Sequence, residues 1–167
     1  LTNLTGAVKL NHTHTLWNDL IFKVDKKSII DEKKLYSTLN RMGYHFSYTV
    51  TKTGEYSHRG SIIDIFPLNY SSPIRIDLFG DEIDTIKYFD VDSQLSIKEI
   101  DNIEIYPFSE FLTLNYIDGM ERQQKYLKYY NKNVSTIADY LDMGVVCYYD
   151  YDTIVNSYSL LVDSIME

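Results

Sequence analysis

The apolar positions of the chain change their spacing several times, and each change predicts a different element. Over residues 31–42, Leu35 and Leu39 recur at the spacing of one helix face. Asp31 is placed to cap the first turn of this helix, and Gly43 follows its last residue as a stop signal. The pattern therefore predicts one well-delimited amphipathic helix.

Alternating apolar and polar residues predict strands around this helix. The clearest signal is a pair of such runs over residues 74–88, joined by a Gly-Asp dipeptide, which predicts a hairpin with a two-residue turn. In that hairpin Phe79 pairs with Glu82 and Asp77 with Asp84. Further strands are predicted at residues 19–24, 44–50, 60–66 and 102–106.

The pattern changes again after residue 111. A polar stretch over residues 118–130 predicts a helix, and Thr136 with Asp139 matches a capping box that starts a short one. The continuous apolar run at residues 145–149 predicts a strand buried on both faces. A last amphipathic helix is predicted over residues 152–165.

These elements predict an α+β fold, with an antiparallel-sheet module built around one main helix. A helix–strand–helix piece of an α/β domain follows it. The expected domains are residues 1–18, a tail of a preceding domain or a linker; 19–112, the sheet module; and 113–167, the α/β piece. The chain opens at Leu1 without an initiator methionine, so we expect a fragment of a longer protein.

Composition narrows the classes of function. The formal net charge is −8, which gives the chain no general attraction for a phosphate backbone. Cys147 is the only cysteine, which excludes an internal disulfide and indicates a reducing compartment. No apolar run of about 18 residues is present, and the N-terminus has no signal-peptide pattern. We therefore expect a cytoplasmic protein with no membrane partner.

Motifs for cofactor or metal binding are sparse. Neither a Walker-type nor a dinucleotide-binding glycine loop occurs, so no cofactor is expected in this chain. His12 and His14 are two residues apart in a predicted coil, where ordinary surface histidines are far more frequent than a zinc pair. No metal ligands or catalytic residues are predicted there.

One acidic cluster supports a competing interpretation, since convergent carboxylates can hold catalytic metal ions. A metal-dependent hydrolase would use Asp64, Asp77 and Asp84. Arg75 is expected on the same sheet face, where it can neutralise Asp77 and Asp84 and weaken this interpretation. The full cluster comprises Asp64, Asp77, Asp81, Glu82 and Asp84.

The same hairpin carries a possible protein-binding surface. Side chains alternate along a strand, so the apolar residues of strand 74–79 face the core while Arg75, Asp77 and Phe79 face outward. An arginine and a phenylalanine exposed together are typical of an interaction hot spot. The alternative is that Phe79 folds under a loop and Arg75 pairs with Asp77 or Asp84. Spacing alone leaves both open.

A series of motifs occurs in order along the sheet module. The motifs are Gly54-Glu-Tyr-Ser-His-Arg-Gly60, Ile63-Asp-Ile-Phe-Pro67, Pro73-Ile-Arg-Ile-Asp-Leu-Phe-Gly-Asp-Glu-Ile-Asp84 and Phe89-Asp-Val-Asp-Ser-Gln94. The series resembles the UvrB-homology module of the bacterial transcription-repair coupling factor (Mfd) family over residues of about 19–112. The related damage-verification protein UvrB is the alternative, but it usually lacks the Phe-Asp-x-Asp-Ser-Gln segment.

The resemblance implies a recruitment module without catalysis of its own, which brings UvrA of nucleotide excision repair to RNA polymerase stalled at a lesion. The residues of the family that contact UvrA fall on Arg59, Arg75 and Phe79. Asp77, Glu82 and Asp84 are secondary interface candidates. The resemblance also implies that residues 113–167 begin a degenerate helicase-like domain. An ATP- and Mg²⁺-dependent translocase and the contacts with RNA polymerase and double-stranded DNA would belong to other domains of the parent.

Overall fold

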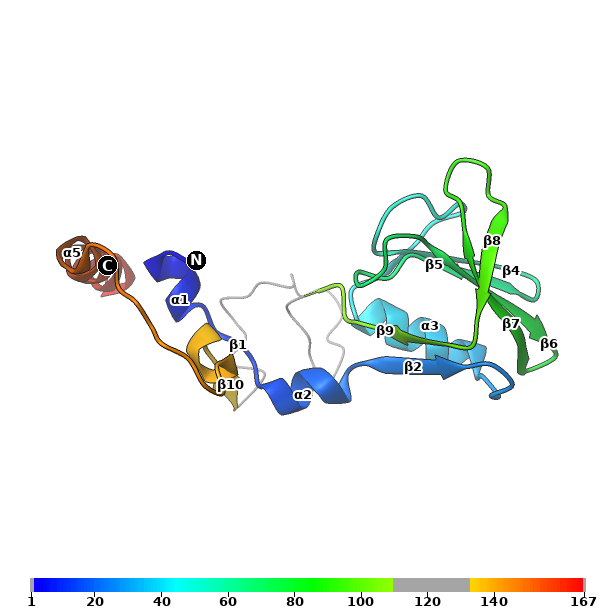
Figure 1. Cartoon of the computed structure of the whole chain (residues 1–167), viewed down its shortest axis with the longest axis horizontal. Helices are drawn as coiled ribbons and strands as arrows, with labels where there is room; N and C mark the ends of the chain where they lie inside the picture. The colour runs from blue at the N-terminus through cyan, green and yellow to red at the C-terminus, as the bar shows by residue number, and fades with distance from the viewer. Residues whose placement is uncertain (1, 110–132, 167) are drawn as a thin grey trace. The chain divides into compact units, whose positions relative to one another are not determined.

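The computed structural model describes residues 2–109 and 133–166 (Figure 1). These residues form two compact units. The sheet unit comprises residues 15–109, and the helical unit comprises residues 2–14 with 133–166. The predicted helix at residues 118–130 lies outside the described residues.

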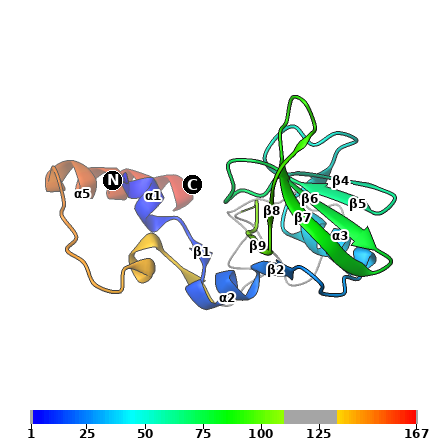
Figure 2. The ribbon, with the colours of Figure 1, turned by 45° about the vertical axis from the view of Figure 1, so that its right-hand side comes forward.

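The main helix of the sheet unit, α3 (Glu32–Arg41), confirms its prediction. The side chain of Asp31 accepts a hydrogen bond from the backbone N–H of Lys34 at 3.0 Å, which caps the first turn. Gly43 follows with a φ of +94°, the left-handed conformation that glycine adopts without strain. Leu35 and Leu39 are both buried, so the predicted face is the one that packs against the sheet (Figure 2).

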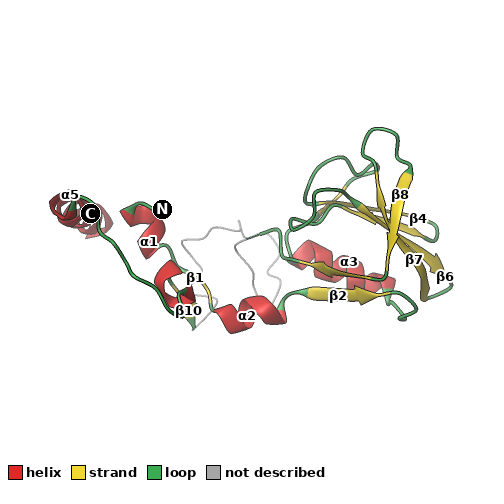
Figure 3. Cartoon of the chain, in the orientation of Figure 1, coloured by secondary structure: helices red, strands yellow, loops and turns green. Residues whose placement is uncertain are grey.

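Six strands form the sheet of this unit, in the order β3-β4-β5-β6-β7-β8. Figure 3 shows strands in yellow, with β4, β6, β7 and β8 of this sheet labelled. All neighbours are antiparallel except the β3–β4 pair. The inner face carries isoleucines that are completely buried with Leu39, and this cluster is the core. The strands are β3 (His45–Phe46), β4 (Glu55–Arg59), β5 (Ile62–Ile65), β6 (Ile74–Phe79), β7 (Glu82–Phe89) and β8 (Ser96–Ile100).

A separate two-stranded pair closes the sheet unit. It joins β2 (Phe22–Asp25) to β9 (Asn102–Ile105) in antiparallel register. Val24, Ile103 and Ile105 from this pair are buried in the same core. The α+β fold class predicted from the sequence is thereby confirmed.

The sequence interpretation of the strands needs three corrections. The strand expected at residues 44–50 is reduced to the two residues of β3. Strand β4 was not predicted, because its sequence Glu-Tyr-Ser-His-Arg has no apolar alternation. Strand β8 was also missed, since only its last residue is partly buried. Because β8 is mostly exposed, it needs no alternation of apolar and polar residues, and its pairing with β7 makes it a strand.

The helical unit has less regular structure. The side chain of Asp139 accepts hydrogen bonds from the backbone N–H and the hydroxyl of Thr136, and the first of these is the bond from the third helical residue back to the N-cap of a capping box. None of the described helices of the chain is both long enough and apolar enough to cross a membrane. The elements are α1 (Leu4–Val8), β1 (Asn11–His12) paired with β10 (Val134–Ser135), the 3₁₀ helix η2 (Ile137–Tyr140) and α5 (Tyr151–Met166); α2 (His14–Asp19) spans the sequence boundary between the units.

The buried strand predicted at residues 145–149 is wrong. These residues have no strand structure, and Val145 is 89% exposed. A strand buried on both faces needs neighbouring strands, and the described residues of this unit offer only the short β1–β10 pair. The last helix is confirmed as α5, with Ile154 and Leu161 less exposed than most of its side chains.

Candidate protein-interaction surface

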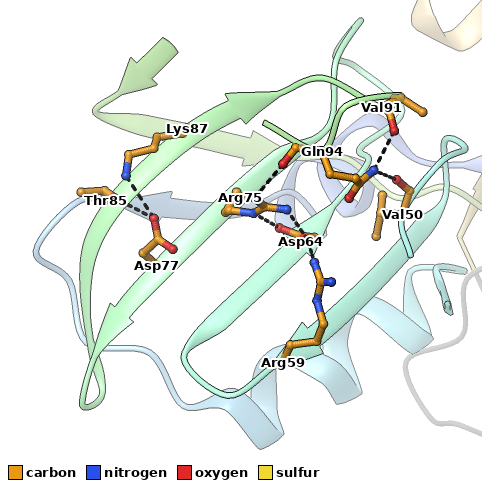
Figure 4. A network of polar contacts seen from close by, with 9 residues as sticks. All are labelled: Val50, Arg59, Asp64, Arg75, Asp77, Thr85, Lys87, Val91 and Gln94. Carbon is orange, nitrogen blue, oxygen red and sulfur yellow. Dashed lines mark hydrogen bonds and ion pairs between the residues drawn. The ribbon is translucent and has the colours of Figure 1, made fainter. Parts of the chain in front are cut away.

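Three adjacent strands bring two arginines onto one carboxylate at the outer face of the sheet (Figure 4). Strand pairing sets Asp64 on β5 directly opposite Arg75 on β6, and Arg59 reaches the same carboxylate from the end of β4. The side chain of Asp64 is 0% exposed. This cluster of Arg59, Asp64 and Arg75 is called the arginine–aspartate cluster below.

Arg75 makes the stronger of the two ion pairs. Its Nε donates to Oδ1 of Asp64 at 2.7 Å and its Nη2 to Oδ2 at 2.9 Å, the two-pronged geometry that suits guanidinium and carboxylate. Hydrogen bonding to Asp64 raises the pKa of Arg75 above its ordinary value. Arg59 adds one bond, from Nη2 to Oδ2 of Asp64 at 2.9 Å. Two cations on one anion leave a net positive charge on this cluster.

The two arginines differ in how much of them a partner could contact. The side chain of Arg75 is only 14% exposed, whereas that of Arg59 is 53% exposed. Arg75 is also covered by Phe89, whose ring centroid lies 4.6 Å from the guanidinium carbon. Arg75 therefore lies on the predicted face, but the expectation that it is exposed beside Phe79 is wrong.

The loop after β7 completes the cover over Arg75. The backbone carbonyl of Gln94 accepts a hydrogen bond from Nη1 of Arg75 at 3.1 Å. Gln94 has a φ of +59°, and its side-chain amide donates to the carbonyl of Val91 at 2.7 Å. Asp90 accepts bonds from the N–H and hydroxyl of Ser93, which tightens the same turn. The Phe-Asp-x-Asp-Ser-Gln segment thus forms a compact loop that fixes the arginine.

Phe79 lies at the free end of the hairpin. Its side chain is 83% exposed, so the alternative in which it folds under a loop is wrong. The predicted two-residue turn is confirmed, since Phe79 pairs with Glu82 and Gly80 has a φ of +63°. Leu78, the preceding residue, is buried against the core. Because Leu78 is anchored in the core, strand β6 keeps the phenyl ring of Phe79 exposed to solvent.

The acidic residues of the hairpin do not converge. The strand register shifts between Asp77 and Leu78, so Asp77 lies opposite Thr85 and not opposite Asp84 as predicted. Asp77 accepts hydrogen bonds from the hydroxyl of Thr85 at 2.7 Å and from Lys87 at 3.2 Å. Arg75 pairs with Asp64, which corrects the expected pairing with Asp77 or Asp84.

Metal binding finds no support in this geometry. No group of three or more His, Cys, Asp or Glu side chains able to hold a metal ion occurs among the described residues. Asp64 forms ion pairs with Arg59 and Arg75, and Asp77 forms one with Lys87. Two of the three carboxylates that a hydrolase would need are therefore neutralised by basic side chains. His12 is not a surface histidine as expected, because it is 1% exposed within β1, and burial lowers its pKa.

Two further residues, Asp64 and Gln94, shape this surface in ways that were not predicted from the sequence. Asp64 was considered only as a metal ligand, although an aspartate between two isoleucines of a buried strand already signals a buried ion pair. Gln94 acts through its backbone carbonyl, which no residue pattern reveals. Arg59, Arg75 and Phe79 all lie on the outer face, and the structure joins the first two directly through Asp64.

Comparison with known proteins places this geometry in context. A family model described as the UvrB interaction domain matches residues 22–111. The chain is 41% identical over 96 residues to the transcription-repair-coupling factor of Haemophilus influenzae, covering 58% of this chain and 8% of the relative. The protein of the same name from Bacillus subtilis is 43% identical over 83 residues, covering 50% and 7%. That from Staphylococcus haemolyticus is 35% identical over 125 residues, covering 75% and 10%. The chain thus spans a tenth or less of the length of these relatives.

Proposed function

The chain belongs to the UvrB interaction domain family, and on that premise we propose that its sheet unit is a recruitment module that binds the repair protein UvrA. The contact would use the outer face of the sheet. In this role the module delivers nucleotide excision repair to DNA lesions at which RNA polymerase has stalled. The name of its relatives, transcription-repair-coupling factor, fits such a task.

The observation that carries the proposal is the exposure of Phe79 at the end of the β6–β7 hairpin, on the same sheet face as the arginine–aspartate cluster. A phenylalanine that is 83% exposed does nothing for the core, whereas it can fill an apolar pocket of a partner. Its strand β6 pairs with β5 as far as Asp77 and with β7 as far as Phe79, so the backbone that carries the ring is already ordered and loses little conformational entropy on binding. The hairpin therefore has the properties of an interface anchor.

Within the arginine–aspartate cluster we assign different roles to the two arginines. Arg59 is the more exposed one and would pair with an acidic group of UvrA. Arg75 would act mainly by holding Asp64, which in turn orients Arg59. Asp77, Glu82 and Asp84 remain secondary contacts in this proposal. No catalytic residue and no cofactor is assigned to this chain.

The experiment is calorimetric titration of the 167-residue chain with purified UvrA, repeated with Phe79→Ala and Arg59→Ala. Truncation of a central anchor should cost about 2 kcal/mol or more, which is about thirtyfold in Kd. Arg59→Ala is preferable to Arg75→Ala, because removal of Arg75 leaves Asp64 buried without its main partner.

Tyr48→Ala is the matched control, since Tyr48 is 85% exposed and lies outside the outer-face cluster. It should bind UvrA as the unsubstituted chain does. A folded chain that shows no heat of binding to UvrA would overturn the proposal. Equal losses with Tyr48→Ala and Phe79→Ala would show that the outer face is not the contact surface.

For the whole protein the proposal follows the family resemblance. An ATP- and Mg²⁺-dependent DNA translocase, with contacts to RNA polymerase and double-stranded DNA, would lie outside this chain. Residues 113–167 would begin a degenerate helicase-like domain, after the module at residues 19–112 and a tail at residues 1–18. The cytoplasm is the compartment we propose, because the single cysteine requires no oxidising environment.

A further inference from the structure

The segment that joins β2 to α3 is fastened to the end of the β6–β7 hairpin. The N–H of Lys27 donates to the carbonyl of Ile83 at 2.8 Å, and the N–H of Ile83 donates to the carbonyl of Ser28 at 2.9 Å. The N–H of Ile30 donates to the carbonyl of Asp81, also at 2.8 Å. The segment thus runs along β7 like a short additional strand, next to the part of β7 that β8 does not cover.

Strand register places Ile29 on the same side of this ribbon as Phe79. Ile29 forms an antiparallel bridge with Glu82, and Glu82 is the partner of Phe79 across the hairpin. Side chains that face one another in such a ladder project to the same side. Two strand spacings separate Ile29 from Phe79, which is about 10 Å. The row therefore presents an apolar side chain, a carboxylate and a second apolar side chain.

Both apolar side chains in this row are almost fully in water. Ile29 is 82% exposed and Phe79 is 83% exposed. The next residue, Ile30, is buried in the core, so Ile29 cannot turn inward without pulling Ile30 out. The turn before it places Lys27 at a φ of +67°, a conformation that disfavours residues other than glycine. The fold accepts this conformation and holds the isoleucine outward.

A single exposed apolar side chain is ordinary on a protein surface. Two of them in register on one hydrogen-bonded ribbon form a more specific feature, because their spacing is set by the strands that carry them. Asp81, Glu82 and Asp84 surround them with negative charge and so favour a basic partner surface. The row is continuous with the surface assigned to UvrA, since Phe79 belongs to both.

We propose that Ile29 is a second apolar anchor of the same surface, with Glu82 as the charged contact between the two anchors. This inference rests on the proposed function. The complementary region of UvrA would have two apolar recesses about 10 Å apart with a lysine or arginine between them. The contact surface would then extend from the sheet to the β2–α3 segment, which the family resemblance did not implicate.

The test is titration of the 167-residue chain with purified UvrA, using Ile29→Asp and the control Ile97→Asp. Ile97 is 63% exposed on β8, so it receives the same change in chemistry away from the Ile29–Phe79 row. Thermal melting of each variant accompanies the titration. Ile29→Asp should bind at least tenfold more weakly, equal to about 1.4 kcal/mol, with an unchanged melting temperature, while Ile97→Asp binds as before.

The outcomes separate this inference from the proposed function. Binding that Phe79→Ala weakens but Ile29→Asp leaves within twofold would overturn the second anchor and keep the recruitment role. An equal loss with Ile97→Asp would also overturn it, since the effect would then come from charge alone. A folded chain that does not bind UvrA would overturn both. Glu82→Lys adds a further check, because reversal of the central charge should weaken binding as well.

Discussion

The two units of this chain use their apolar side chains in opposite ways. In the sheet unit six isoleucines of β5, β6 and β7 are completely buried in one core cluster with Leu35 and Leu39 of α3, namely Ile63, Ile65, Ile74, Ile76, Ile83 and Ile86. In the helical unit Leu160 of α5 is 70% exposed and Met143 is 96% exposed. Burial of apolar surface is the dominant favourable contribution to folding, so the sheet unit holds most of the stability of the described chain. Similar residues therefore make a core in one unit and an open surface in the other.

The largest effect should come from the arginine–aspartate cluster. Asp64→Ala removes the fully buried carboxylate and leaves the largely buried guanidinium of Arg75 without its counter-ion. We expect the sheet unit to lose about 3–5 kcal/mol of unfolding free energy. Amide hydrogen exchange, followed separately on peptides of the two units, should show the loss in residues 22–105 alone. Asp84→Ala, at an exposed position, is the control, and an equal loss there would contradict the explanation.

A matched pair of leucine truncations compares the units directly. Leu39→Ala in α3 creates a cavity in the core and should cost about 2–5 kcal/mol in urea-induced unfolding of the sheet unit. Leu160→Ala in α5 removes a side chain that is 70% exposed and should change stability by no more than about 0.5 kcal/mol. Comparable losses for the two variants would mean that the helical unit has a core of its own.

Alkaline pH should destabilise the sheet unit through ionisation of Tyr44. Burial raises the pKa of Tyr44 to about 12, and its hydroxyl donates to the carbonyl of Tyr106 at 2.7 Å. A raised folded-state pKa gives stability that is complete below the unfolded pKa of about 10 and is lost as pH rises toward 12. The loss should reach about 2–3 kcal/mol.

The measurement for Tyr44 is urea unfolding at a series of pH values, with Tyr44→Phe beside the unsubstituted chain. The difference between the two should be constant below pH 10 and shrink above it, since phenylalanine does not titrate. A difference that does not change with pH up to 12 would show that the Tyr44 hydroxyl is not protected in the folded chain.

The smallest effect on stability is expected at Val145, in the run for which the sequence pattern predicted burial on both faces. Val145→Asp replaces a residue that is 89% exposed, so thermal stability should change by less than the equivalent of about 0.5 kcal/mol. A buried strand would instead tolerate aspartate very poorly. A strong destabilisation by this variant would restore the predicted strand.

Local signals explain which elements were predictable. The helix α3 carries its cap at Asp31 and its stop at Gly43, and the hairpin carries its turn at Gly80. Each of these signals works within a few residues, so the sequence reveals it. Strand β4 has no such signal. Its Glu55 and Ser57 are buried although both are polar. Glu55 accepts hydrogen bonds from the N–H groups of residues 51 and 52, and Ser57 lies opposite Asp64 in the strand register.

For the candidate surface, the sequence pattern predicted only which face of the sheet its residues occupy. Alternation placed Arg75 and Phe79 on the outer side of the sheet, and burial of Ile74 and Ile76 on the inner side confirms this. It could not show that Arg75 is covered, because the covering groups come from β5 and from the loop at Gln94. The shift in register after Asp77 is likewise a property of two strands together.

The pairing of β2 with β9 has a consequence for how this module can be moved between proteins. Phe22, at the start of β2, is the partner of Ile105, at the end of β9, so their Cα atoms lie about 5 Å apart. The polypeptide therefore enters and leaves the sheet unit at neighbouring positions. A segment with adjoining ends can be spliced into a surface loop of an unrelated host without forcing that loop open. Residues 22–105 are therefore suited to genetic insertion, as one unit, into a surface loop of a carrier protein.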